Sequence, residues 1–189
     1  MERRSTQEPV VPDVPTPIAV VRDFVNTTDR ELGTDDLSSP TELARYLAER
    51  GLTASGTEAT GADLDAALRL RAGLRRALEL NHEGTQATLP ELAEALADLP
   101  VTLTWTPEGS TLTTTDSTAR GGLARIAIAA HEAVAAGIWW RLKICAWDEC
   151  EWAFYDHSKN RSRNWCEYGC GNKVKTRAYR ARRAAARAG

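Results

Sequence analysis

Apolar positions recur at helical spacing through most of the first 140 residues of the chain. Residues three and four apart lie on one face of an α-helix, so this spacing predicts amphipathic helices with one buried side. We expect helices over 39–50, 61–80, 89–100 and 119–138. The last of these is almost entirely apolar or small, which predicts a helix buried at the centre of the fold.

Residues at the ends of these segments fit helix boundaries. Ser39 can cap the first helix, Pro40 suits the first helical position, and Gly51 suits the position after the last turn. The earlier stretch 18–28 is rich in apolar and β-branched residues and is compatible with a short strand or with a buried first helix. The pattern alone leaves both alternatives open.

Between residues 101 and 115 the period changes from that of a helix to that of a strand. Val101, Leu103 and Trp105 alternate with threonines, and a turn at 107–110 follows. Alternation with period two, broken by Pro and Gly, predicts a β-hairpin. The fold class is therefore a mainly α domain with a small β-hairpin (α+β).

The chain divides into three segments. Residues 1–15 are rich in proline and lack the apolar stretch of a signal peptide, so we expect a flexible lead-in. Residues 16–140 form the helical domain, and 141–189 form a separate small domain. No stretch approaches the roughly 18 apolar residues of a membrane helix, so we expect a cytoplasmic protein without membrane contact.

Charge separates the last segment from the rest. The net charge is −2, but residues 141–189 carry twelve Lys and Arg against five Asp and Glu, while the remaining residues are strongly acidic. A basic segment of this kind favours an anionic polymer as its partner. The alternative is that the basic segment docks on the acidic part of its own chain.

All four cysteines lie in the basic segment, at Cys145, Cys150, Cys166 and Cys170. Two short-spaced pairs are typical of structural zinc sites, in which each pair forms a local turn and the ion joins the turns. A segment of this length needs such an ion because it buries little core of its own. Free thiols, a disulfide, an iron–sulfur cluster and a redox-reactive zinc site are the alternatives.

The stretch between the two pairs reads as a strand, a polar turn and a return strand. Trp152, Phe154 and Trp165 are expected to cover the site as an apolar shell. His157 lies in the middle of this stretch, and we expect it not to bind the metal because four thiolates complete the shell. The order of turn, hairpin and helix is treble-clef-like.

Cys166 and Cys170 are four residues apart, which places two side chains on one face of a helix. A helix that starts near Cys166 would therefore carry both in its first turn. From Asn172 onward Ala and Arg dominate, and both residue types favour helix. Positive charge surrounds much of this helix and leaves little surface for a core, so we expect it to be exposed.

Two stretches resemble a known family. The four cysteines with "DHSKNRSRNWCEYGCGNK" resemble the CGNR-type zinc finger, and "DFVNTTDRELGTDDLSSPTELARYLAERG" resembles the start of the helical (ABATE-type) domain that precedes it. The family consists of bacterial transcription regulators. The resemblance implies Zn²⁺ on the four cysteines, with the tetrad at Cys170, Gly171, Asn172 and Lys173. Lys173 replaces the arginine of the pattern, which keeps the charge but loses bidentate hydrogen bonding.

The sequence therefore predicts a DNA-binding regulator that is not an enzyme, since four cysteines leave zinc no open position. We expect base contacts from Asn172, Arg177 and Arg180, and phosphate contacts from Lys159, Arg161, Arg163, Lys175 and Arg182, with Lys173 in either role. The expected partner is duplex DNA. A homodimer and a small-molecule effector of the helical domain are compatible with this role. RNA binding and a redox-sensing or protein-interaction module are the alternatives.

Overall fold

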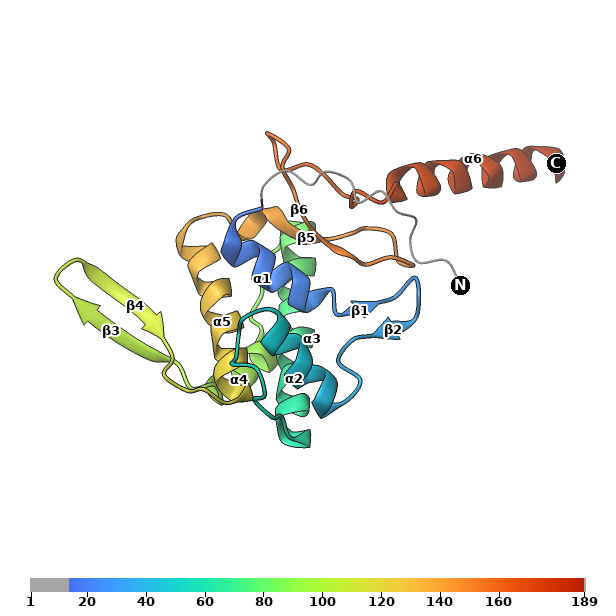
Figure 1. Cartoon of the computed structure of the whole chain (residues 1–189). Coiled ribbons are helices and arrows are strands. Elements are labelled where there is room, and N and C mark those ends of the chain that lie inside the picture. The colour runs from blue at the N-terminus through green and yellow to red at the C-terminus, as the bar shows by residue number, and fades with distance from the viewer. Residues whose placement is uncertain (1–13, 189) are drawn as a thin grey trace.

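The computed structural model of the chain describes residues 14–188 (Figure 1). Most of the flexible lead-in expected at 1–15 lies outside the described residues. Five helices form the body: α1 (Thr16–Val25), α2 (Pro40–Glu49), α3 (Gly61–Glu83), α4 (Pro90–Ala97) and α5 (Ala119–Ala135). The four predicted helices are confirmed, and the open alternative at 18–28 resolves as the helix α1 followed by a turn.

The helix ends follow from local hydrogen bonding. The Ser39 hydroxyl accepts from the backbone N–H of Glu42 at 3.2 Å, as predicted for the start of α2. At the start of α3, Thr60 and Asp63 form a reciprocal capping box. Gly84 ends α3 in the left-handed conformation, with φ of 69°, which glycine adopts without steric cost.

Helix α3 is the centre of the body, in contact with α1, α2, α4 and α5 (Figure 1). Its fully or almost fully buried side chains include Leu70, Leu74 and Leu78. Helix α5 packs along α1, and its small residues let the backbones approach closely. On another face of α5, Gly122 packs closely against α2 and the loop after it, since a Cβ there would lie 2.8 Å from Thr53 Cγ2 and 3.1 Å from Leu47 Cδ1.

Two small hairpins leave the body. Strands β1 (Thr28–Asp29) and β2 (Thr34–Asp35) form a short antiparallel pair beside α2. Strands β3 (Thr102–Thr106) and β4 (Gly109–Thr113) confirm the predicted hairpin, which projects on one side in Figure 1. Its apolar side chains are not buried: Trp105 is 74% exposed and Leu103 is 54% exposed.

The C-terminal segment begins with a 3-10 turn, η1 (Trp139–Arg141), and continues into the antiparallel strands β5 (Leu142–Ile144) and β6 (Ala153–Tyr155). We call residues 141–188 the finger. Leu142, Ile144 and Ala153 on one face of this hairpin belong to the hydrophobic core of the body. On the other face, Phe154 packs against the four cysteines. Successive side chains of a strand point to opposite faces, so this one hairpin contributes to both the core of the body and the cluster around the cysteines.

The predicted return strand is wrong. The residues between Tyr155 and helix α6 (Cys170–Ala188) contain no strand, and β6 instead pairs with β5, which precedes Cys145. The physical reason is the side chain of Asp156, which binds the backbone N–H groups of Ser158 and Arg163 and holds this stretch as a loop.

The fold class is confirmed: the chain is mainly helical, with small antiparallel hairpins and a four-cysteine finger that ends in a helix. Within residues 14–188, every helix is too short or too polar to cross a membrane.

Candidate metal centre and nucleic-acid interface

Four cysteine sulfurs meet at the start of α6. The Sγ atoms of Cys145, Cys150, Cys166 and Cys170 all lie within 4.8 Å of one another, and each residue is buried. Cys150 Sγ is 3.8 Å from Cys166 Sγ, which is 3.5 Å from Cys170 Sγ. A tetrahedral zinc site with Zn–S bonds of about 2.3 Å places its sulfurs about 3.8 Å apart. The four side chains therefore fit zinc.

Three separate elements supply these ligands. Cys145 directly follows β5, and Cys150 ends the turn that begins at Trp147, whose carbonyl accepts from the Cys150 N–H at 2.9 Å. Cys170 is the first residue of α6. Cys166 lies in the preceding loop, so the expectation that both members of the second pair share the first helical turn is wrong. The left-handed Gly169, with φ of 76°, separates the loop from the helix.

Thiols crowded in this way do not ionise independently. A hydrogen bond with Cys150 lowers the pKa of Cys145, and the same contact raises the pKa of Cys150. Hydrogen bonds with Cys145 and Cys150 raise the pKa of Cys166 as well. Four adjacent thiolates repel one another unless a cation neutralises them, and a divalent metal supplies that charge.

An aromatic shell covers the sulfurs, as the sequence predicts for Trp152, Phe154 and Trp165. Trp147 and Tyr168 complete it. Gly171 packs directly against the Trp165 ring, since a Cβ there would lie 3.2 Å from Cε3 of the indole. His157 is not part of the sulfur cluster; its ring packs edge-on against Tyr155 at 4.8 Å between centroids.

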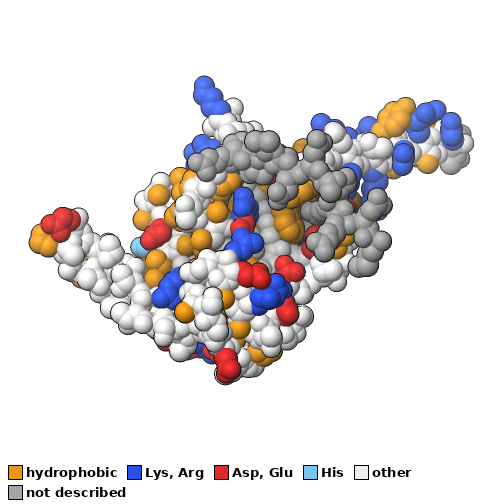
Figure 2. Space-filling view, in the orientation of Figure 1, with side chains coloured by type: hydrophobic (Ala, Val, Ile, Leu, Met, Phe, Trp, Pro, Cys, Tyr) orange, Lys and Arg blue, Asp and Glu red, His pale blue; other side chains and the backbone are white. Residues whose placement is uncertain are grey.

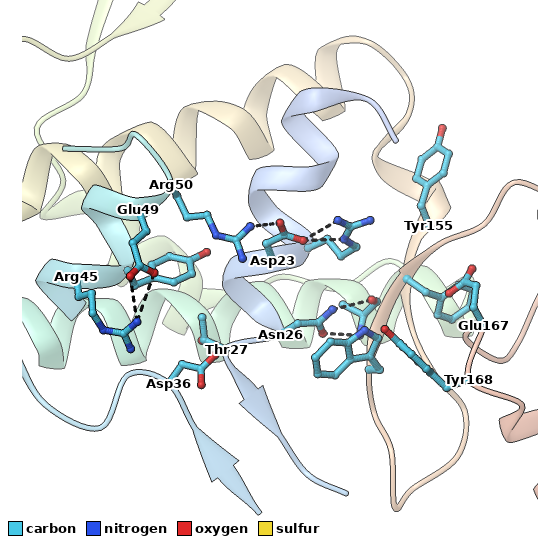
Figure 3. Close-up of a pocket in the computed structure, with 15 residues that line it drawn as sticks. Asp23, Asn26, Thr27, Asp36, Arg45, Glu49, Arg50, Tyr155, Glu167 and Tyr168 are labelled. Carbon is cyan, nitrogen blue, oxygen red and sulfur yellow. Dashed lines mark hydrogen bonds and ion pairs between the residues drawn. The ribbon is translucent and has the colours of Figure 1, made fainter. Parts of the chain in front are cut away.

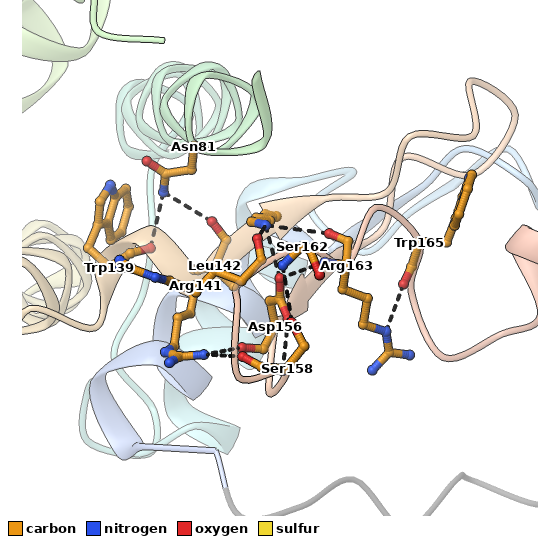
Figure 4. A network of polar contacts seen from close by, with 11 residues as sticks. Asn81, Trp139, Arg141, Leu142, Asp156, Ser158, Ser162, Arg163 and Trp165 are labelled. Carbon is orange, nitrogen blue, oxygen red and sulfur yellow. Dashed lines mark hydrogen bonds and ion pairs between the residues drawn. The ribbon is translucent and has the colours of Figure 1, made fainter. Parts of the chain in front are cut away.

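A buried ion pair holds the loop between the hairpin and α6 (Figure 4). Lys143 Nζ donates to Asp156 Oδ2 at 2.9 Å and to the Arg161 carbonyl at 2.5 Å. Burial raises the pKa of Asp156, but hydrogen bonds from Ser158 and Lys143 outweigh it and lower the pKa to about 2. Asp156 is completely buried, so its charge requires these donors.

Polar side chains of the helical body bind the backbone of the finger at hairpin β5–β6. The Asn26 amide donates to the Ala153 carbonyl at 2.9 Å and accepts from its N–H at 2.8 Å. Asn81 donates to the carbonyls of Trp139 and Leu142 (Figure 4). These contacts satisfy buried polar groups on both sides, so they fix the position of β5–β6 on the helices.

The basic helix α6 projects from this centre. Seven of its residues are Lys or Arg and none is acidic. In Figure 2 these cations lie along the arm that extends from the body, and almost all described side chains beyond Gly171 are exposed. Asn172, Lys173, Arg177 and Arg180 share the helix face that adjoins the Cys145–Cys150 turn, where they line a hollow with Trp147 and Glu149. Spacings of three and four residues place them together.

Two of these predicted contact residues have acidic partners. Lys173 Nζ lies 2.8 Å from Glu31 Oε1, in the β1–β2 turn, and 4.5 Å from the centroid of the Trp147 ring. Arg177 Nη1 lies 2.5 Å from Glu149 Oε1. The Glu31 contact means that the start of α6 meets the acidic body, as the docking alternative expected for the whole basic segment. Beyond Arg177 the helix makes no further ion pair with described residues.

The remaining predicted contact residues fall into two groups. Within residues 14–188, the side chains of Lys159, Arg161, Lys175, Arg180 and Arg182 are exposed and have no acidic partner. Arg163 is different, since its guanidinium donates to the Trp165 carbonyl at 3.1 Å and pairs with Glu167 at 3.0 Å. Arg163 thus contributes to the structure of the finger itself.

Sequence reasoning missed the residues that join the finger to the body. Arg75 donates to the Glu151 carbonyl at 3.0 Å and pairs with the Glu151 carboxylate at 3.3 Å. Asn26 has the sequence context of a capping or turn residue, although its side chain binds β6. The only signal was that polar Asn81 occupies a buried position in an otherwise apolar helical stripe.

Comparison with known proteins agrees with this geometry. Residues 141–183 match the family described as CGNR zinc finger, so the four sulfurs form a zinc site. No curated protein matches the chain. Residues 19–137 match the ABATE family, described as "Putative stress-induced transcription regulator". Both matches confirm the resemblance found in the sequence. Because the second match covers more than half of the chain, the chain belongs to the ABATE family.

Proposed function

We propose that this protein is a non-enzymatic transcription regulator that binds duplex DNA through α6, with zinc as a structural ion. The observation that carries the proposal is the exposed basic helix, with seven cations and no acidic residue, which begins at a zinc ligand. Lys and Arg neutralise phosphates and release counterions. A helix of this kind also fits the major groove, where Arg and Asn read base edges.

The zinc site supports a structural role for the metal. All four ligands are thiolates, so the tetrahedral shell has no open position for water or substrate. The ion joins the Cys145–Cys150 turn to the loop at Cys166 and to the start of α6. The metal therefore fixes the direction of the helix and leaves the binding chemistry to Lys and Arg.

Trp152 and Tyr155 do not offer the stacking surface that single-stranded RNA requires, although Tyr179 on α6 is 53% exposed. Base stacking on proteins requires exposed aromatic rings beside basic side chains. Trp152 and Tyr155 are instead half-buried and line a pocket between the finger and the body. The four sulfurs are also buried, which does not favour the redox-sensing alternative, since oxidation of cysteine follows exposure.

The proposal is tested by measuring the affinity of the zinc-loaded chain for a labelled duplex over a range of salt concentrations. The logarithm of the association constant should fall linearly with the logarithm of salt concentration. Arg180→Ala combined with Arg182→Ala should weaken binding and reduce the slope by about 0.9 for each phosphate that the protein no longer neutralises.

The matched control is Arg69→Ala combined with Arg76→Ala on α3, which removes the same charge from exposed positions of the body. The control should bind DNA like the unaltered chain. Absence of binding at low salt, or an equal loss in both double variants, would contradict the proposal. Selection of bound sequences from a random duplex pool then separates specific from non-specific binding.

A further inference from the structure

A pocket of about 510 Å³ lies where α1 and α2 meet the finger (Figure 3). Its volume falls in the range of small-molecule sites, about 300–1,000 Å³, and such sites often lie between domains. The sulfur cluster and the exposed part of α6 do not contribute to it. The proposed DNA contacts therefore leave this pocket without a role.

Both parts of the chain supply its walls. Figure 3 shows Arg45 and Glu49 of α2, with Arg50 directly after it, on one side, and Tyr155, Glu167 and Tyr168 of the finger on the other. The Asn26–Ala153 hydrogen bonds cross between the two sides. Aromatic rings line much of the pocket, from Tyr46, Trp152, Phe154, Tyr155 and Tyr168. Rings of this kind bind planar apolar groups.

One wall carries surplus positive charge. The Asp23 carboxylate accepts from two guanidinium groups: Arg22 lies 2.7 Å from Oδ1, and Arg50 bonds Oδ2. One carboxylate neutralises only one of the two cations. Arg22 uses its Nε and Nη2 on Asp23, so its Nη1 has no partner among the described residues. The unused N–H groups of a guanidinium favour carboxylate oxygens.

The positive surplus is confined to the group of Arg22, Asp23 and Arg50, since the rest of the lining carries the carboxylates of Asp36, Glu49 and Glu167 against the single cation of Arg45. Arg45 is already shared between Glu42 and Glu49, and Glu167 pairs with Arg163. The exception is Asp36, whose carboxylate has no cationic partner within residues 14–188. In Figure 3, Thr27 lies between Asp36 and Asp23. Asp36 therefore disfavours a second anionic group at that end of the pocket.

From this arrangement we infer that the pocket binds a small aromatic monocarboxylate, with its carboxylate at Arg22 and Arg50 and its ring against the aromatic walls. Such a ligand contacts α1, α2 and the finger at once. Its binding would thus be linked to the position of the finger on the body, and any effect on DNA affinity through this linkage rests on the proposed function.

Benzoate, benzyl alcohol and benzylamine are matched probes, since they share a ring and differ in charge. Calorimetric titration of the zinc-loaded full chain, without DNA, should show one benzoate site and binding at least about tenfold weaker for the other two. Terephthalate, which adds a second carboxylate opposite the first, should bind more weakly than benzoate. Because no DNA is present, absence of benzoate binding would not bear on the proposed DNA binding. Absence of DNA binding would likewise not bear on this inference.

Variants of the lining locate the site. Arg50→Gln should weaken benzoate binding about tenfold or more. Arg22→Gln should do the same, and provides a second variant if the first alters folding. Arg45→Gln is the matched control, because its guanidinium lines the same pocket but is engaged by two glutamates. It should change the affinity less than about threefold.

Three outcomes would overturn the inference. The first is benzylamine binding as tightly as benzoate. The second is unchanged benzoate affinity in a folded, zinc-loaded Arg50→Gln or Arg22→Gln chain. The third is no saturable binding of benzoate, 4-hydroxyphenylacetate or indole-3-acetate with a Kd below about 10 mM.

Discussion

Hairpin β5–β6 has one face in the core of the helical body and the other in the zinc site. On the body side, Leu142, Ile144 and Ala153 join a core of buried side chains from all five body helices. On the zinc side, the only buried residues of the cluster within residues 14–188 are Phe154 and the four cysteines. The body is stabilised by burial of apolar area, whereas the finger depends on a metal and on hydrogen bonds.

This difference defines what each region contributes. The body core can form without zinc, because its helices bury their apolar faces against one another. The loop from Asp156 to Gly169 has no strand or helix of its own. It is held at Asp156 by Lys143 and near its C-terminal end by the zinc ligands Cys166 and Cys170. Variants that affect one region and not the other test the division.

The largest expected effect follows from Cys166→Ser. Structural zinc sites bind the metal with about 10–16 kcal/mol at neutral pH, and loss of one thiolate removes most of that stabilisation. Zinc content should fall well below one ion per chain, and amides of residues 156–169 should lose protection from hydrogen exchange. Amides of α3 should keep theirs. Full zinc occupancy in this variant would exclude the proposed ligand set.

The second effect concerns the buried ion pair. Asp156→Asn keeps the shape of the side chain but leaves Lys143 without its counter-charge, which should cost about 3–5 kcal/mol of stability in the finger. Chemical denaturation followed by zinc release measures this loss. The control Asp65→Asn, at an exposed position of α3, should change stability by less than about 0.5 kcal/mol. Equal stability of the two variants would show that the pair is dispensable.

The third effect concerns a variant that should destabilise the body and leave the zinc site intact. Leu70→Ala removes a completely buried side chain from the centre of α3 and should lower the free energy of unfolding by about 2–5 kcal/mol. The folded variant should still hold one zinc ion per chain, because Leu70 packs within the body core and not against the sulfur cluster. Loss of zinc from the folded chain would mean that the two cores are not separable.

The smallest effect concerns the ion pairs at the start of α6. Glu31→Gln and Glu149→Gln free Lys173 and Arg177 from their acidic partners. Exposed ion pairs contribute about 0–1 kcal/mol, so each change should raise DNA affinity by no more than about fivefold. Glu108→Gln at the tip of hairpin β3–β4 makes the same charge change far from α6. An equal gain in this control would assign the effect to net charge alone.

Periodicity and cysteine spacing were sufficient to predict the helices, hairpin β3–β4 and the zinc ligands, because these depend on neighbours in the sequence. The return strand after Tyr155 was predicted wrongly, since strand pairing depends on which partner the chain brings alongside. Here the partner is β5, on the far side of the Cys145–Cys150 turn. The side chain of Asp156 then satisfies the backbone that a return strand would have paired.

The junction between body and finger could not be predicted for the same reason. Asn26 lies 127 residues from Ala153 in the chain, and its role is evident only when the two meet. The expected boundary near residue 140 follows the change in charge, whereas the core continues through it to Leu142 and Ile144. The charge of a segment reflects the residues on its surface. A short apolar strand that packs into a neighbouring core changes this charge very little, so the sequence gives little sign of the packing.

Duplex affinity of a single preparation before zinc removal, after chelation and after zinc is returned tests the central claim most directly. We predict that affinity falls about tenfold or more without zinc, since α6 must then be ordered on binding, and recovers when zinc is added. Far-UV circular dichroism should show that the body helices persist throughout. Unchanged DNA affinity in the zinc-free chain would contradict the account, because it would mean that the metal does not position the helix.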